Sequence, residues 1–472
     1  MTNEEYFADE EFLEMLDDYE RAVESDEPVF LDVEDLADIA DYYQQKGLYD
    51  NAKKALDRVI ELEPDSTVAL NYMVHNAITA GDYAAAEDYL EQMDDHTVPE
   101  YTYCRAEIWL AQGDAGRADR YLRKMLNDVD EDEYQDYVLD VVNLYAEYNY
   151  NEHAMQWMMM AKAEDSEDFK ELMARILTGL MKYDDAERIF NELIDKNPFK
   201  KNYWTALAHI QLQKDEYGAA VSSSEYAIAI DPNYAEALFL KGEALFHLED
   251  YENALDFFRR YEQLNPDDEL GLLQQGNCLV NMLRQEEAVE VLKRAVDKSD
   301  EESPYLIEIY HELAMAYSSM KMLKSALYYM ERAEELSIDP AEEKVIRGHI
   351  LLENDLLEEA QRTFEEAVAC SMHPQHTIIQ FIVSFYDNRY YECAYEMFKN
   401  YFESDLSKEW NEGYAHMALC CYHLKHYDEF LSYLRKACEK NPIEAKIVLG
   451  ELFPYGMQVA DYYEHMANKL KK

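Results

Sequence analysis

Three prolines placed 34 residues apart constrain this chain more than any other feature of its sequence. Pro198, Pro232 and Pro266 close the similar phrases LIDKNPFK, AIAIDPNY and YEQLNPDD. A fixed period of this length is typical of repeat architectures, in which each unit packs against its neighbours. We therefore expect an array of repeated units rather than a set of unrelated domains.

Two positions of the 34-residue frame keep a small residue. Position 20 is alanine in eleven of twelve units, and position 8 is alanine or glycine in nine of twelve. Positions 4, 7, 8 and 11 share one helical face, as do positions 20, 24 and 27, so each unit is predicted to be a helix hairpin. The units start near residues 33, 67, 99, 135, 167, 201, 235, 269, 307, 341, 375 and 411.

Gly242 lies in the middle of a predicted helix, where glycine costs about 1 kcal/mol relative to alanine. Gly276 and Gly348 fall at the same position 8 of their units. We expect the small residue at position 8 to face the small residue at position 20, so that the two helix backbones approach closely.

This pattern resembles the tetratricopeptide repeat (TPR) family over residues 33 to about 444. Beside the period and the small residues, it has a large apolar residue at position 24, such as Phe258, Ala at position 27, such as Ala295, and Pro at position 32. The resemblance implies an all-α fold, a right-handed superhelical solenoid of antiparallel helix pairs with helical caps. It also implies a concave ligand-binding surface, lined by positions 2, 5, 6, 9, 12 and 13 of each first helix.

The frame divides the chain into five parts. Two acidic interruptions, NDVDEDEY and DKSDEESPY, lengthen the spacing and are either hinges between sub-arrays or longer solvated turns in one solenoid. The predicted parts are an acidic amino-terminal capping helix (1–32), repeats 1–3 (33–134), repeats 4–8 (135–306), repeats 9–12 (307–444) and carboxyl-terminal capping helices (445–472).

The charge balance is strongly acidic. The chain holds 100 Asp plus Glu against 43 Lys plus Arg, a formal net charge of −57. Nucleic acid and anionic membrane surfaces should therefore repel it, and a basic or apolar protein or peptide partner is expected, with homo-oligomer formation left open. Seven cysteines without a CxxC pair, and the lack of a signal-like amino end or a membrane-spanning apolar run, favour a cytoplasmic location.

Histidine is enriched on the predicted concave surface. About two histidines are expected at the 72 positions in question from the 13 in the chain, whereas eight occur there. The same positions carry one basic residue, Arg175, and position 5 has no lysine, which argues against the carboxylate clamp of chaperone-binding TPR domains. The eight histidines are His75, His209, His247, His311, His349, His376, His416 and His423.

Eight residues are the candidates for contact with a ligand on this surface. His209, Glu243 and Asn277 occupy position 9 of successive units, with His247 one turn after Glu243. Histidine and glutamate are zinc-type ligands, but no fixed metal-binding spacing supports them, so neither a metal site nor a cofactor is predicted. The candidates are His209, Phe239, Glu243, His247, Asn277, Asn281, His311 and His349.

The sequence lacks the motifs of common enzymes. It has no nucleophile elbow, no phosphate-binding loop and no dinucleotide fingerprint, so we expect no enzymatic activity. A scaffold or adaptor that binds a protein or peptide on its concave surface is the first hypothesis. Two other classes stay open: a regulatory sensor of a small ligand or metal, and a structural assembly subunit that stacks through its ends or outer face.

Overall fold

The computed structural model is helical wherever it describes regular structure, with α-helices and short 3-10 segments. Its contacts divide the chain into two compact units, Met1–Phe199 and Lys200–Lys472. The described residues are 7, 10–25, 31–45, 49–64, 66–93, 96, 98–162, 166–300, 303–404, 410–454 and 456–470.

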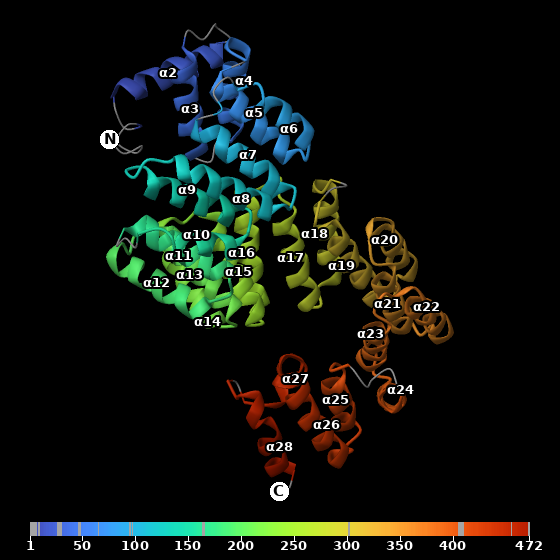
Figure 1. The fold of residues 1–472 in the computed structure, drawn as a ribbon. Coiled ribbons are helices and arrows are strands. Elements are labelled where there is room, and N and C mark those ends of the chain that lie inside the picture. The colour runs from blue at the N-terminus through green and yellow to red at the C-terminus, as the bar shows by residue number, and fades with distance from the viewer. Residues whose placement is uncertain are drawn as a thin grey trace. The chain divides into compact units, whose positions relative to one another are not determined.

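The amino-terminal unit consists of helix α2 (Glu10–Ser25) followed by five helix pairs (Figure 1). The first helix of each pair begins within one residue of the start that the 34-residue frame predicts. The pairs are α3 (Val33–Gln45) with α4 (Tyr49–Leu62), α5 (Thr67–Thr79) with α6 (Tyr83–Leu90), α7 (Pro99–Ala111) with α8 (Ala115–Met125), α9 (Tyr134–Glu147) with α10 (Asn151–Met158), and α11 (Glu167–Gly179) with α12 (Tyr183–Lys196).

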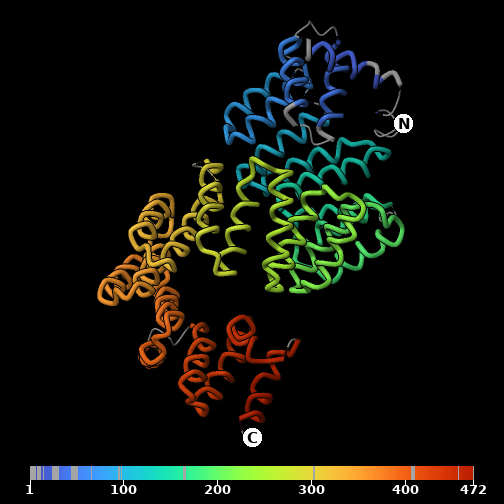
Figure 2. The backbone as a smooth tube through the Cα atoms, turned by 180° about the vertical axis from the view of Figure 1, so that it is seen from behind, coloured from blue at the N-terminus to red at the C-terminus, as the bar shows by residue number. Residues whose placement is uncertain are grey.

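The carboxyl-terminal unit continues the same pattern, and its first helices begin within three residues of the predicted starts. From α13 to α27, helices that follow one another in the sequence lie side by side (Figure 2). The pairs are α13 (Lys201–Gln213) with α14 (Tyr217–Ile230), α15 (Ala235–His247) with α16 (Tyr251–Leu264), α17 (Leu270–Asn281) with α18 (Gln285–Lys298), α19 (Leu306–Ser319) with α20 (Leu323–Leu336), α21 (Pro340–Glu353) with α22 (Leu357–Cys370), α23 (Pro374–Asp387) with α24 (Tyr391–Glu403), and α25 (Tyr414–His423) with α26 (Tyr427–Lys440), before α27 (Pro442–Leu449) and α28 (Tyr462–Leu470).

The core of each pair is formed by the positions that the frame singled out. Positions 8 and 20 are buried in every unit, from Ala40 and Ala52 to Ala418 and Phe430. First helices also pack on one another, as α5 does on α7 and α19 on α21. We call the surface formed by positions 2, 5, 6, 9, 12 and 13 of these helices the first-helix face.

The glycines at position 8 pack against position 24. A Cβ atom on Gly242 would lie 2.6 Å from Cε1 of Phe258, and Gly276 and Gly348 meet Leu292 and Phe364 even more closely. The nearest atoms to these glycines thus belong to position 24, and the predicted contact with position 20 stays a prediction. A large side chain at position 24 fills the space between the two helices and leaves no room for a Cβ.

Each described hairpin turns through one residue with positive φ, at position 15 of its unit. The N–H group of the following residue then bonds to a carbonyl five residues back, as Glu216 does to Gln211 at 2.8 Å, which is the Schellman ending of a helix. Glycine supplies this geometry twice, at Gly81 and Gly113, and other residues supply it with φ of 57° to 66°: Asn149, Met181, Asp215, Glu249, Leu283, Lys321, Asp355, Arg389 and Lys425.

The two ends of the array are covered by helices, although the five-part division itself stays a prediction. Phe12, Leu16 and Tyr19 of α2 are buried, while α27 packs on α25 and α28 on α26. Residues 1–6, 8–9, 26–30, 455 and 471–472 of the expected caps, and 301–302 of the second acidic interruption, lie outside the described residues. Among the helices that are described, none combines the length and apolar content that crossing a bilayer requires.

Candidate functional site

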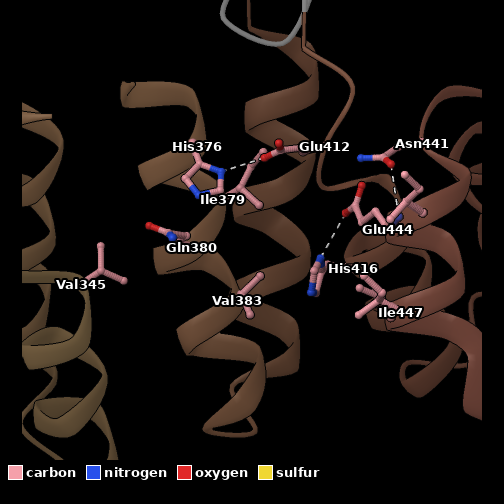
Figure 3. Close-up of a pocket in the computed structure, with 12 residues that line it drawn as sticks. Val345, His376, Ile379, Gln380, Val383, Glu412, His416, Asn441, Glu444 and Ile447 are labelled. Carbon is pink, nitrogen blue, oxygen red and sulfur yellow. Dashed lines mark hydrogen bonds and ion pairs between the residues drawn. The ribbon is translucent and has the colours of Figure 1, made fainter. Parts of the chain in front are cut away.

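A groove of about 530 Å³ lies on the first-helix face near the carboxyl-terminal end of the compact unit Lys200–Lys472 (Figure 3). In the unit that starts at 375, positions 2, 5, 6 and 9 line it, which are positions that the TPR resemblance assigned to ligand binding. The lining residues are Val345 of α21, His376, Ile379, Gln380 and Val383 of α23, Glu412 and His416 at α25, and Asn441, Ile443, Glu444, Ile447 and Val448 at α27.

Helix α27 forms one wall of the groove because it starts directly after α26. Pro442 takes its first position, which needs no donor N–H, and the Asn441 side chain accepts a hydrogen bond from the N–H of Glu444 at 3.1 Å. This cap sets Ile443 and Ile447 one turn apart, and they are 74% and 75% exposed. The groove therefore has an apolar wall that the chain itself leaves in contact with water.

Two carboxylates stand beside the apolar wall, each paired with a histidine. His376 Nδ1 lies 2.8 Å from Glu412 Oε2, and His416 Nδ1 lies 3.3 Å from Glu444 Oε1, as the dashed lines in Figure 3 show. Glu444 Oε1 also accepts the backbone N–H of Gly413 at 2.8 Å. Because the lining residues include no lysine or arginine, the groove is apolar and acidic.

None of the eight predicted candidate residues lines this groove. His209 on α13 and Asn281 at the end of α17 are exposed, and Asn277 is half-buried. Asn281 Nδ2 donates to the backbone oxygen of Asn277 at 2.8 Å. Phe239 is half-buried against the rings of Phe258 and Tyr261, with centroids 5.6 and 5.1 Å away.

His247 stacks on an aromatic ring of the preceding unit. Its ring lies parallel to that of Tyr217, with centroids 4.7 Å apart and an angle of 7° between the planes. His423 stacks on Tyr391 in the same way, at 4.9 Å and 5°. Since both histidines occupy position 13 and both tyrosines position 17, this is a recurring contact between units.

The three remaining candidates, His311, His349 and Glu243, are half-buried. His311 Nε2 lies 2.8 Å from Glu343 Oε2, and Glu343 is buried. The half-buried His349 has its pKa lowered by burial, although Asp387 and Glu353 act to raise it. Burial also raises the pKa of Glu243. Burial thus favours the neutral form of both His349 and Glu243.

Histidine paired with a carboxylate that lies in, or just before, the next helix of this face is a repeated feature. His75 and Glu107, at 3.0 Å, give a fourth example beside those of His311, His376 and His416. Glu412 lies at position 2, where a carboxylate is expected simply to face the helix dipole. Sequence spacing missed these pairs because it describes one unit and not the register between two units.

The structure does not bring His209, Glu243 and His247 together as a zinc-type set. Within the described part of the chain, one group of three such ligands has its ligand atoms within 4.8 Å of one another, and it consists of His75, Cys104 and Glu107.

Ile443 and Ile447 were also missed at the sequence level. The sequence places the start of the carboxyl-terminal capping helices at 445, three residues after the true start of α27 at Pro442. The signal was present, because an Asn-Pro pair before an apolar segment is a strong helix start.

The repeat family follows from a comparison with family models. Models described as tetratricopeptide repeat match residues 36–66, 172–235 and 205–269, which coincide with the helix pairs α3–α4 and α11–α16. The chain is a tetratricopeptide repeat protein. Arrays of this family are typically non-catalytic, and the fold supports a role as a protein-interaction scaffold.

Known relatives match this TPR protein over parts of its length. Protein FlbA of Caulobacter vibrioides is 27% identical over 122 residues, which is 26% of this chain and 20% of FlbA. A thermophilic TPR protein of Thermus thermophilus is 24% identical and matches 40% of this chain and 100% of its own, with a TM-score of 0.33. YrrB, described as a TPR protein with an unusual peptide-binding site, is 20% identical over 38% of this chain and 91% of its own, with a TM-score of 0.32.

Proposed function

We propose that this TPR protein is an adaptor that holds a basic or apolar segment of a partner protein on its first-helix face. The groove between α23, α25 and α27 is the contact site that carries the proposal, because it joins an apolar wall to two carboxylates. The eight sequence candidates, the cytoplasmic location, the exclusion of nucleic acid and membrane, and self-association remain predictions.

The apolar wall supplies the affinity in this proposal. Ile443 and Ile447 are three-quarters exposed, and full burial of such a side chain is worth roughly 1.5 to 3 kcal/mol. Ile379 and Val383 lie in the same groove on α23. A partner that places an apolar side chain there gains from contacts that the free chain lacks.

The carboxylates supply the charge preference. Glu412 and Glu444 stand at the groove, and the net charge of −57 adds a long-range field of the same sign. A segment with lysine or arginine beside its apolar residue is therefore steered toward the groove and paired there, whereas an acidic segment is repelled.

Selection from a random peptide library displayed on phage, with the full chain as target, tests the proposal. We expect the selected peptides to combine an apolar residue with neighbouring Lys or Arg. The double variant Ile443→Lys, Ile447→Lys should weaken their binding at least about tenfold, because it removes apolar area and places two cations in the groove.

The matched control is Ile338→Lys, Met372→Lys. Both residues are fully or almost fully exposed, at 101% and 90%, and lie in turns outside the groove, so this variant carries the same charge change without touching the site. Peptides that bind both double variants equally well, or a selection dominated by acidic peptides, would show that the groove is not the binding site.

A further inference from the structure

Three metal-type ligands gather on the first-helix face of the amino-terminal compact unit, Met1–Phe199. His75 comes from α5, and Cys104 and Glu107 come from α7, one turn apart. A ring nitrogen, the sulfur and a carboxylate oxygen all lie within 4.8 Å of one another. Composition and spacing did not predict this cluster, because its members belong to two different units.

The separations fit a tetrahedral ion after a small closing movement. His75 Nδ1 already lies 3.0 Å from Glu107 Oε2. Ligand atoms bound to zinc at about 2.0 to 2.3 Å lie roughly 3.5 Å apart. Because the three ligand atoms lie within 4.8 Å of one another, the sulfur would have to approach by no more than about 1.3 Å. Cys104 Sγ donates to Asn71 Oδ1 at 2.8 Å, and coordination would replace that thiol proton.

The surroundings hold the carboxylate in place and favour a cation. The Tyr148 hydroxyl donates to Glu107 Oε1 at 2.8 Å, which leaves Oε2 directed toward His75. Glu147 of α9 adds a second negative charge, which interacts electrostatically with both His75 and Glu107. The positive charge of Arg175 offsets part of the charge of Glu147. Orientation of a ligand by such a neighbour is common in metal sites.

The cluster is anchored at one end and open at the other. Cys104 is 2% exposed, the Glu107 side chain 15% and the His75 side chain 46%. An ion can therefore enter past His75, while the sulfur and the carboxylate are held by the packed helix α7.

We propose that His75, Cys104 and Glu107 bind a zinc ion, with a water molecule or the Asn71 amide oxygen in the fourth position. Sulfur and imidazole nitrogen select zinc over the oxygen-seeking ions Mg²⁺ and Ca²⁺. The ion would tie α5 to α7, and so link two successive units. This proposal does not depend on the proposed adaptor function.

The other histidine–carboxylate pairs show what is special about this one. His311 with Glu343 and His376 with Glu412 have similar distances of 2.8 Å, yet neither belongs to a group of three ligands among the described residues. They are internal controls, because a generic affinity of histidine–glutamate pairs for zinc would act on them equally.

Titration of the full, reduced chain with Co²⁺ and then Zn²⁺, in an excess of Mg²⁺ to occupy exposed carboxylates, tests the proposal. We expect a thiolate-to-cobalt absorption band that saturates near one ion per chain and disappears when Zn²⁺ displaces the cobalt. Cys104→Ser, which keeps a hydroxyl donor toward Asn71, should abolish the band and weaken zinc binding at least about tenfold. His376→Ala should leave both unchanged.

Circular dichroism without metal establishes that each variant is folded. If Cys104→Ser does not fold, His75→Gln replaces it, since that side chain is partly exposed, and the same loss of affinity is expected. The proposal is overturned if the wild-type chain gives no thiolate band, or if the folded variant binds zinc as tightly as the wild type.

Discussion

At the scale of single residues, Gly242 shows how one missing atom sets a helix–helix contact. Its helix accepts the propensity cost of glycine because the Phe258 ring occupies the space of a Cβ. The repeat pattern predicted that a small residue belongs at position 8. It did not predict which residue of the second helix lies nearest to position 8. Positions 20 and 24 lie on the same face of that helix, so the pattern alone cannot distinguish between them.

Gly242→Ala should therefore destabilise the chain although alanine is the better helix former. The added methyl would lie 2.6 Å from Phe258 Cε1, and overpacking of this kind costs about 1 to 3 kcal/mol. A lower thermal unfolding midpoint is expected, and the losses caused by Gly242→Ala and Phe258→Ala should be less than additive, because the smaller side chain at 258 removes the clash.

Gly218→Ala is the matched control for this substitution. Gly218 is an exposed glycine in helix α14 with no atom within 4 Å of its Cβ position, so alanine should raise the midpoint slightly. Equal effects of the two substitutions would mean that propensity, and not the contact with Phe258, governs position 8.

His349 should make stability depend on pH. Burial lowers its pKa below the ordinary 6.5, with Asp387 and Glu353 opposing the shift. Below pH 6.5 the unfolded chain therefore binds the proton more readily than the folded one, so this contribution to stability is complete above pH 6.5 and is lost as the pH falls.

His349→Gln should remove the part of the stability loss on acidification that comes from this histidine. Unfolding of the variant and the wild type is compared at about pH 7.5 and about pH 5.5, where the wild type should lose more stability on acidification. The difference between the two chains is the quantity to measure, because other groups titrate alike in both. A difference that does not change with pH would contradict the assignment.

At the scale of the elements, the hairpin turn has one geometry and many sequences. Every described position 15 has positive φ, yet leucine, methionine, lysine and glutamate hold it as well as glycine. Each such residue costs about 1 kcal/mol or more relative to glycine. The turns thus keep their shape because the packed helices on both sides enforce it.

Leu283→Gly should stabilise the turn between α17 and α18. Leu283 has φ of 58° and is 82% exposed, so little packing is lost and the strain of a Cβ at this backbone angle is relieved. The gain is expected to be below about 1 kcal/mol, because glycine also adds entropy to the unfolded chain. It is measured as a rise in the unfolding midpoint.

Leu283→Ala provides the comparison, because alanine retains the Cβ and should bring no such gain. If alanine and glycine shift the midpoint equally, the effect comes from the loss of the leucine side chain and not from the backbone.

The helix pairs were predictable from sequence, and much of the site was not. Positions 8 and 20 recur, so periodicity locates helices to within three residues. The pairing of His376 with Glu412 depends on the register between units, and the wall at Ile447 depends on a helix that starts out of frame. The positive φ of Lys321 and Arg389 could not be predicted, because lysine and arginine do not favour that backbone conformation.

At the scale of the whole molecule, the net charge of −57 acts on every equilibrium of the chain. Like charges repel within the folded state, and added salt screens them, since the Debye length falls from about 30 Å at 0.01 M to about 8 Å at 0.15 M. Salt should therefore raise the unfolding midpoint.

The same increase in salt should weaken the binding of a basic peptide, mainly through slower association. Both quantities can be followed in one NaCl series with an uncharged apolar peptide as the reference. If salt changed the affinities of the basic and the uncharged peptide equally, the proposal that charge steers the partner to the groove would be wrong.

The contacts of this chain lie either within one 34-residue unit or between two successive units. Duplication of a unit retains the first kind of contact and changes the second. Gly242 and Phe258 lie within one unit, so a duplicated 34-residue block carries their contact intact. His311 and Glu343 lie in successive units, so insertion of a block between them gives each a new neighbour. Duplication in the gene can thus lengthen the array without loss of fold, while each new junction offers selection a fresh pair of side chains on the first-helix face.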